Sequence, residues 1–187
     1  SRTRRHLAEY THVEAEMPFL TFEQLLDAIE ALVCDTYARV LQRAGEQLRA
    51  VNPHAAVPTR PFRRISYEEA LEFTRRHGIL NPLTGAPFRF GEDIKEAEER
   101  RMIDLIGEPV FLCRFPVEMK AFYMMKDKRD PRLTESCDLL VPGVGEIVGG
   151  SMRIWDYDEL IAAYRREQLD PTPYYWFTDQ RRYGSVP

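Results

Sequence analysis

The sequence has 187 residues, 44% of them hydrophobic, which is enough to bury the core of one domain. Its formal net charge of −4 argues against a protein that coats nucleic acid, although it permits a local basic patch such as SRTRRH at residues 1–6. No apolar run approaches the roughly 20 residues that cross a bilayer, and no charged-then-apolar leader opens the chain. We therefore expect a cytoplasmic protein that does not contact a membrane.

The three cysteines, Cys34, Cys113 and Cys137, are an odd number without CxxC spacing. This pattern predicts neither a disulfide framework nor a zinc site, and it is typical of a reduced cytosolic protein. Cys137 precedes Asp138, but no histidine lies nearby in the sequence to activate its thiol. We expect Cys137 to be a small buried apolar side chain.

The segment 9–19, EYTHVEAEMPF, alternates with period two and predicts a strand. Tyr10, His12, Glu14 and Glu16 would share one face of it. That face either meets water or floors a polar pocket, and the pocket is favoured because His and Glu are poor strand formers unless something binds them.

Apolar residues at helical spacing follow that segment. Thr21 is a suitable N-cap, and the apolar positions after it predict a long scaffold helix that ends near residue 52. Prolines and basic residues at 52–64 predict a linker or an insertion. Ser66, with an acid three residues later, opens a second helix that ends at Gly78.

A charged helix is expected at 96–106, with its EAEERR run on a solvated face. Short apolar runs then follow one another without intervening helices, which predicts an antiparallel sheet. These runs are residues 109–116, 120–125, 137–141 and 145–154. Asp156 caps a helix over 157–168, and an aromatic-rich helix follows from Pro171. The fold class is therefore α+β, an antiparallel sheet flanked by helices, with a mobile helical insertion around 52–106.

Residues 138–153, DLLVPGVGEIVGGSMR, place two acids and an arginine on mostly apolar strands. Buried charges are costly unless they are paired. If their strands pair, the Asp138 and Glu146 carboxylates can converge, as suits a magnesium ion shared with phosphate. Arg153 can point into the same pocket and bind a carboxylate, an amide oxygen or a phosphate. A salt bridge across a hairpin would explain the same residues without a ligand.

The opening 22 residues resemble the loop and second strand of motif 2 in class II aminoacyl-tRNA synthetases. In that motif a His or Arg is followed at intervals of four by an aromatic residue and an acid, and His6, Tyr10 and Glu14 fit this pattern. FPVEMKAFYM, DLLVPGVGEIVGGSMR and DPTPYYWFTDQRRYG are similar to the asparaginyl branch, especially its eukaryotic cytosolic members. The resemblance runs end to end and implies that residues 1–187 are part of one catalytic domain, with 52–106 the least specific part.

This resemblance implies an ATP site. Arg5, His6 and Leu7 match the loop that holds ATP, with the cations on its phosphates. Tyr10 matches the aromatic residue on which adenine stacks. Glu146, together with Asp138, matches the acids that hold Mg²⁺ on the triphosphate.

The resemblance also implies an amino-acid pocket beside Gly149. Arg153 matches the arginine that reads the side-chain oxygen, and Glu14 matches the acid that accepts from an asparagine NH₂. A carboxamide fits this pair because Glu accepts and Arg donates, whereas aspartate would place a second carboxylate against Glu14. Lys120 is either a pocket cation or a lysine at a strand end that reaches toward solvent.

The implied reaction is the ATP- and Mg²⁺-dependent activation of L-asparagine to asparaginyl-adenylate, followed by transfer to tRNA(Asn). Arg5, His6, Glu146 and Arg153 are the residues expected to act in catalysis. Residues 1–4 would face the tRNA acceptor end, where basic groups contact phosphate.

Parts of the family pattern are expected outside the 187 residues: the start of motif 2 before them, motif 3 after them, and motif 1 further upstream. The fragment alone is therefore expected to be inactive, and the full-length parent to be a homodimer. Three alternatives remain: an aspartyl-tRNA synthetase, a tRNA-independent enzyme that makes asparagine from aspartate, and a non-catalytic binding module derived from a synthetase.

Overall fold

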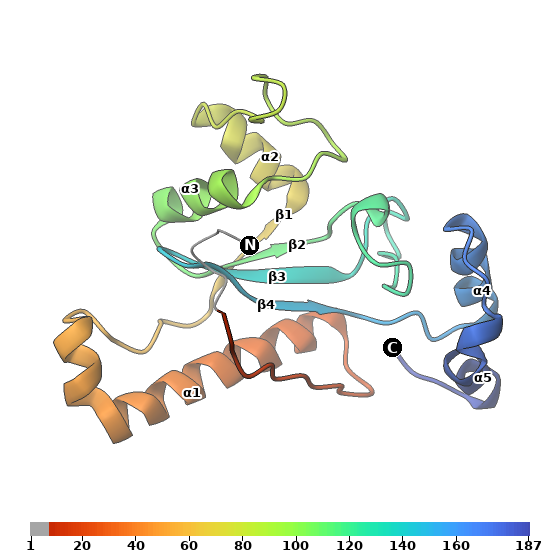
Figure 1. The fold of residues 1–187 in the computed structure, drawn as a ribbon, viewed down its shortest axis with the longest axis horizontal. Coiled ribbons are helices and arrows are strands. Elements are labelled where there is room, and N and C mark those ends of the chain that lie inside the picture. Colours follow the sequence, from red (N-terminus) through yellow and green to blue (C-terminus); the bar gives the residue numbers. More distant parts are fainter. Residues whose placement is uncertain (1–7) are drawn as a thin grey trace.

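The computed structural model describes residues 8–187, which form a sheet with helices on both faces. Figure 1 shows α1 along one face, α2 and α3 over the other, and α4 and α5 beyond one end of the strands. The elements are α1 (Phe22–Val51), β1 (Arg63–Ser66), α2 (Tyr67–Arg76), α3 (Glu96–Ile106), β2 (Val110–Cys113), β3 (Ser136–Val141), β4 (Gly145–Ser151), α4 (Tyr157–Arg166) and α5 (Tyr175–Tyr183). The predicted α+β class is confirmed.

The sheet has the order β1-β2-β3-β4. β2, β3 and β4 pair antiparallel, as predicted, whereas β1 pairs parallel with β2. β1 begins inside the stretch predicted as a linker. Its sequence RRIS is only four residues long and half basic, and it gives no strand pattern.

The strand predicted over 120–125 is wrong. This stretch contributes only an isolated bridge between Met124 and Arg153, because Phe122 and Tyr123 pack against the buried cluster of α4 instead of entering a ladder. The strand predicted over 9–19 is also absent. None of the strands in the described part of the chain pairs with it, and residues 8–19 are exposed. An alternating pattern identifies a strand only when a neighbouring strand supplies hydrogen bonds.

A β-bulge divides the pairing of β3 with β4. Leu139 pairs with Val148 but the next residue, Leu140, pairs with Glu146, so that Ile147 is the extra residue. Side chains alternate between the faces of a strand, and one extra residue reverses the alternation beyond it. Val148 packs on the α1 side, and the bulge turns Glu146 to the opposite face, where α3 lies.

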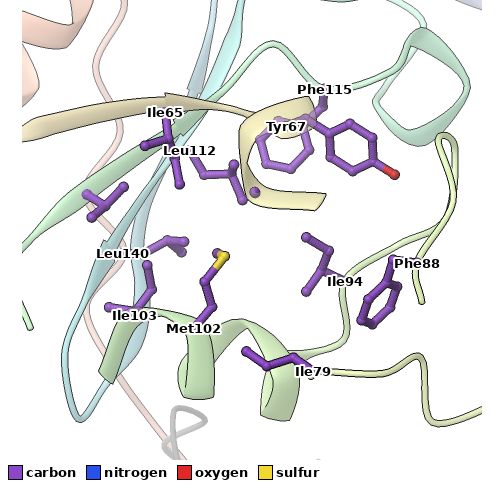
Figure 2. Packing of buried hydrophobic residues seen from close by; sticks show 12 residues of the cluster. Ile65, Tyr67, Ile79, Phe88, Ile94, Met102, Ile103, Leu112, Phe115 and Leu140 are labelled. Atoms are coloured by element: carbon purple, nitrogen blue, oxygen red, sulfur yellow. The ribbon is translucent and has the colours of Figure 1, made fainter. Parts of the chain in front are cut away.

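The core has one apolar cluster on each face of the sheet. One lies between α1 and the strands and includes Leu26, Phe111 and Leu139. The other lies between the strands and the pair α2 and α3, where Figure 2 shows Tyr67 and Met102 among its buried side chains. Residues 63–106 supply eight of the twelve buried side chains of this second cluster, so they pack against the sheet as part of the core. Their status as an insertion within the catalytic domain stays a prediction.

The predicted helix starts are confirmed. Thr21 with Gln24 and Ser66 with Glu69 form capping boxes, and the Asp156 side chain accepts from the backbone N–H of Glu159. Such caps satisfy the backbone N–H groups that the first turn of a helix leaves without partners. No helix in residues 8–187 has the length and apolar character needed to cross a membrane.

We predict that Leu140→Ala destabilises the protein by about 2–5 kcal/mol, since it removes a fully buried side chain from the cluster under α3. Leu83→Ala is the matched control, because Leu83 is 80% exposed and its truncation leaves no cavity. Chemical denaturation measures both. Equal free energies of unfolding for the two variants would contradict this description of the core.

Candidate active site

Asp138 and Glu146 meet above Gly149 on the face of the sheet that α3 covers. Asp138 lies opposite Gly149 in the ladder, and the bulge places Glu146 on the same face. A Cβ added at Gly149 would lie 3.3 Å from Glu146 Oε1 and 3.6 Å from Asp138 Oδ1. The two predicted acids therefore converge, and the glycine provides the room for their oxygens.

Lys120 belongs to this group of charges. Its Nζ lies 2.8 Å from Asp138 Oδ2 and 3.8 Å from the centre of the Phe115 ring, so that a carboxylate and an aromatic face hold the ammonium together. Lys120, Asp138 and Glu146 line a cavity of about 240 Å³, which also receives Glu96 and Glu99 of α3. Lys120 is therefore a pocket cation and not a lysine that reaches into solvent.

Arg153 lies on a second, larger groove of about 780 Å³ that follows β4. Its Nη2 lies 3.2 Å from Glu16 Oε1, and its Cζ lies 4.5 Å from the centre of the Tyr123 ring. Glu14 lines the same groove, but its carboxylate lies 3.7 Å from His12 Nδ1. Glu14 and Arg153 thus line the same groove, but the residue that contacts Arg153 directly is Glu16.

Gly149 lines the groove as well, which makes it the point where the two sites adjoin. The acids lie on one side of this residue, and the arginine lies four residues beyond it along the chain. A ligand with an anionic group at one end and a polar side chain at the other could span both.

Three predicted ATP-site residues, Arg5, His6 and Leu7, lie outside the described residues. Tyr10 is described and 68% exposed, with its ring centre 6.1 Å from that of His12. The exposed ring leaves a face open to a planar base. Within residues 8–187, no group of three or more His, Cys, Asp or Glu is arranged to hold a metal ion, so Asp138 and Glu146 are a pair and not a complete cage.

Sequence reasoning gave no role to Tyr123 and treated Glu16 only as part of a polar face. Tyr123 was not recognised as a site residue because its stretch, KAFYMM, was interpreted as a strand. Glu16 could have been found as the acid two residues beyond Glu14 on the same face of the alternating segment. Which of Glu14 and Glu16 contacts Arg153 depends on the position of the Arg153 side chain in the folded protein, and the sequence alone does not give that position.

The cysteines lie away from this site, in the buried cluster between α1 and the sheet. Burial raises the pKa of the Cys113 thiol to about 12, and it raises the pKa of Cys137 further. Both thiols stay protonated near neutral pH. The prediction that Cys137 is a small buried side chain is confirmed.

The family model for class II tRNA synthetases (D, K and N) matches residues 1–187. The chain belongs to this family. It is 61% identical to the cytoplasmic asparagine–tRNA ligase of Bos taurus over 188 residues, which covers all of this chain and 34% of that protein. This class II synthetase chain therefore spans about a third of the length of its relatives.

Two solved structures separate the asparaginyl from the aspartyl branch. The Entamoeba histolytica asparaginyl-tRNA synthetase in complex with asparaginyl-adenylate has a TM-score of 0.94 and 57% identity, covering 100% of this chain and 42% of that one. The aspartyl-tRNA synthetase of the same organism has a TM-score of 0.80 and 28% identity, covering 100% and 39%. This synthetase chain is more similar to the asparaginyl enzyme in both backbone and sequence.

We predict that Cys113 and Cys137 resist thiol reagents at pH 8 in the folded protein. At that pH a thiol with a pKa of about 12 is ionised in about one molecule in ten thousand, and only the thiolate reacts. The reactive thiols are counted with a chromogenic disulfide reagent before and after unfolding in denaturant. Rapid reaction of these two thiols without denaturant would contradict the burial described here.

Proposed function

We propose that this chain is part of the catalytic domain of an asparagine–tRNA ligase. The observation that carries the proposal is its close match to a synthetase solved with asparaginyl-adenylate. The convergence of two acids and an arginine on either side of Gly149 supports it independently, because an aminoacyl-adenylate joins a phosphate to an amino acid. We further propose that the whole protein works in the cytoplasm as a homodimer, in keeping with its cytoplasmic relatives.

Arg153 and the acids beside it would read the asparagine side chain. The guanidinium donates to the side-chain oxygen, and Glu14 accepts from the NH₂ group, since both residues line one groove. Aspartate would set a carboxylate against Glu14 and Glu16, and this repulsion disfavours it. Specificity for asparagine thus comes from carboxylate acceptors to which a carboxamide NH₂ can donate a hydrogen bond and a carboxylate cannot.

Asp138 and Glu146 would hold Mg²⁺ on the triphosphate of ATP. Magnesium typically binds one or two carboxylates together with substrate phosphates and water, and a converging acid pair above a glycine fits that need. Bound there, the ion would neutralise the negative charge that builds up on the phosphates. Lys120 keeps Asp138 in place through its 2.8 Å contact and adds a positive charge on the same side.

The chemistry needs alignment more than proton transfer. The asparagine carboxylate attacks the α-phosphorus of ATP and pyrophosphate leaves. The terminal ribose hydroxyl of tRNA(Asn) then attacks the acyl carbon of the adenylate, the acyl–phosphate bond breaks, and AMP leaves. The groove along β4 would orient asparagine through Arg153, and the acids above Gly149 would orient the phosphates. Arg5, His6 and Leu7 would hold ATP, with its adenine on Tyr10, and residues 1–4 would contact the tRNA acceptor end.

We expect the full-length protein to catalyse pyrophosphate exchange with asparagine and not with aspartate. Arg153→Ala should raise the KM for asparagine about 10- to 100-fold, since a charged hydrogen bond contributes about 1.5–3 kcal/mol. Arg165→Ala, which truncates an exposed arginine of α4, is the control. Exchange with aspartate instead of asparagine would favour the aspartyl enzyme, absence of exchange would favour the non-catalytic module, and a silent Arg153→Ala would mean that Arg153 forms an internal salt bridge.

Gly149→Ala should raise the Mg²⁺ concentration that gives half-maximal exchange several-fold. The new methyl group would lie 3.3 Å from Glu146 Oε1 and push that carboxylate away from Asp138. The preference for asparagine should be retained. Val144→Ala, in the turn before the strand with a side chain 46% exposed, is the control. An unchanged Mg²⁺ dependence in Gly149→Ala would contradict the assignment of the acid pair.

A further inference from the structure

Arg181 of α5 is anchored by three contacts within the protein. Its Nε donates to the Ile154 carbonyl at 3.2 Å, and its Nη1 donates to the Phe177 carbonyl at 2.8 Å. Its Cζ lies 3.9 Å from the centre of the Phe177 ring. One of these contacts is to the residue directly after Arg153, so Arg181 ties α5 to the backbone that presents the Arg153 side chain.

That backbone is fixed on both sides of Arg153. The N–H of Met152 donates to the Glu135 carbonyl at 2.8 Å, and the N–H of Ile154 donates to the Tyr123 carbonyl at 3.0 Å. Arg181 donates to the carbonyl of the same residue, Ile154. Ile154 is therefore held from two directions, by the Tyr123 loop and by α5.

The charge of Arg181 also acts on the Arg153–Glu16 pair. Burial lowers the pKa of Arg181, Tyr164 raises it, Arg153 lowers it and Glu16 raises it. The Arg181 guanidinium is thus within electrostatic range of both members of the pair. Like charges repel, so the positive charge of Arg181 opposes movement of the Arg153 guanidinium toward it.

We propose that Arg181 is a positioning residue for Arg153, holding its guanidinium where it reads the asparagine side chain. This inference rests on the proposed function. Arg181 acts in two ways: its fork fixes the Ile154 backbone, and its charge opposes movement of the Arg153 guanidinium toward Arg181. A side chain that only stabilised α5 would not change how asparagine binds relative to ATP.

The test compares Arg181→Met with Arg182→Met in the full-length protein. Arg182 is the matched control, because it is the next residue of the same helix and contacts Tyr157 and Asp179 instead of the residues around Arg153. Pyrophosphate exchange gives kcat and the KM for asparagine and for ATP. Arg181→Lys is the third variant, because it keeps the charge but can reach only one of the two carbonyls.

We expect Arg181→Met to raise the KM for asparagine about tenfold, the effect of losing one charge-assisted hydrogen bond, with the KM for ATP unchanged. Arg181→Lys should give a smaller rise, and Arg182→Met should behave as the unsubstituted protein. If Arg181→Met fails to fold, the comparison of Arg181→Lys with Arg182→Met decides the matter.

Two results would overturn the inference while the proposed function stands. One is the same KM for asparagine in the Arg181 and Arg182 variants. The other is a lower apparent kcat in Arg181→Met with both KM values unchanged, which a smaller fraction of folded enzyme would give without any change in how asparagine is positioned. Absence of asparagine-dependent exchange in the unsubstituted protein would instead overturn the proposed function, and this inference with it.

Discussion

The candidate site depends on one irregularity in one strand, the β-bulge at Ile147. A regular β4 would place Glu146 on the same face as Val148, against α1, where a carboxylate would meet the apolar cluster. The bulge turns it toward Asp138 and α3 instead. The charge is then accommodated by Lys120 and the polar cavity, and the acid pair exists only because this single extra residue is present.

β4 also connects the two halves of the site. From Glu146 the strand passes Gly149, which leaves space for the acids, and leads to Arg153, which lies on the groove. The distance between the phosphate-binding end and the amino-acid-binding end of the candidate site is thus set by β4, which pairs along its length with β3. Elements remote in sequence then hold Arg153: Glu16, the Tyr123 ring and, through the Ile154 carbonyl, Arg181 of α5. A rigid strand presents the groups, and loops and helices orient them.

Local signals in the sequence predicted the elements whose determinants are local. The capping residues Thr21, Ser66 and Asp156 located three helices because side chain and backbone interact within one turn. Segments 9–19 and 120–125 were misassigned because strand formation depends on a partner elsewhere in the chain. The acids and Arg153 were found from their pattern and family resemblance. Whether Glu14 or Glu16 contacts Arg153 depends on the tertiary structure. The roles of Tyr123 and Arg181 depend on it too, because the Tyr123 loop and α5 are remote from β4 in the sequence and lie beside it only in the fold.

A crystal structure of the full-length protein with a non-hydrolysable asparaginyl-adenylate tests this account most directly. We predict that the ligand spans Gly149, with its phosphate on the side of Asp138 and Glu146 and its side-chain oxygen within hydrogen-bond distance of Arg153. Arg181 should still contact the Ile154 carbonyl. A ligand bound elsewhere, with Arg153 paired only to Glu16 as an internal salt bridge, would contradict the account.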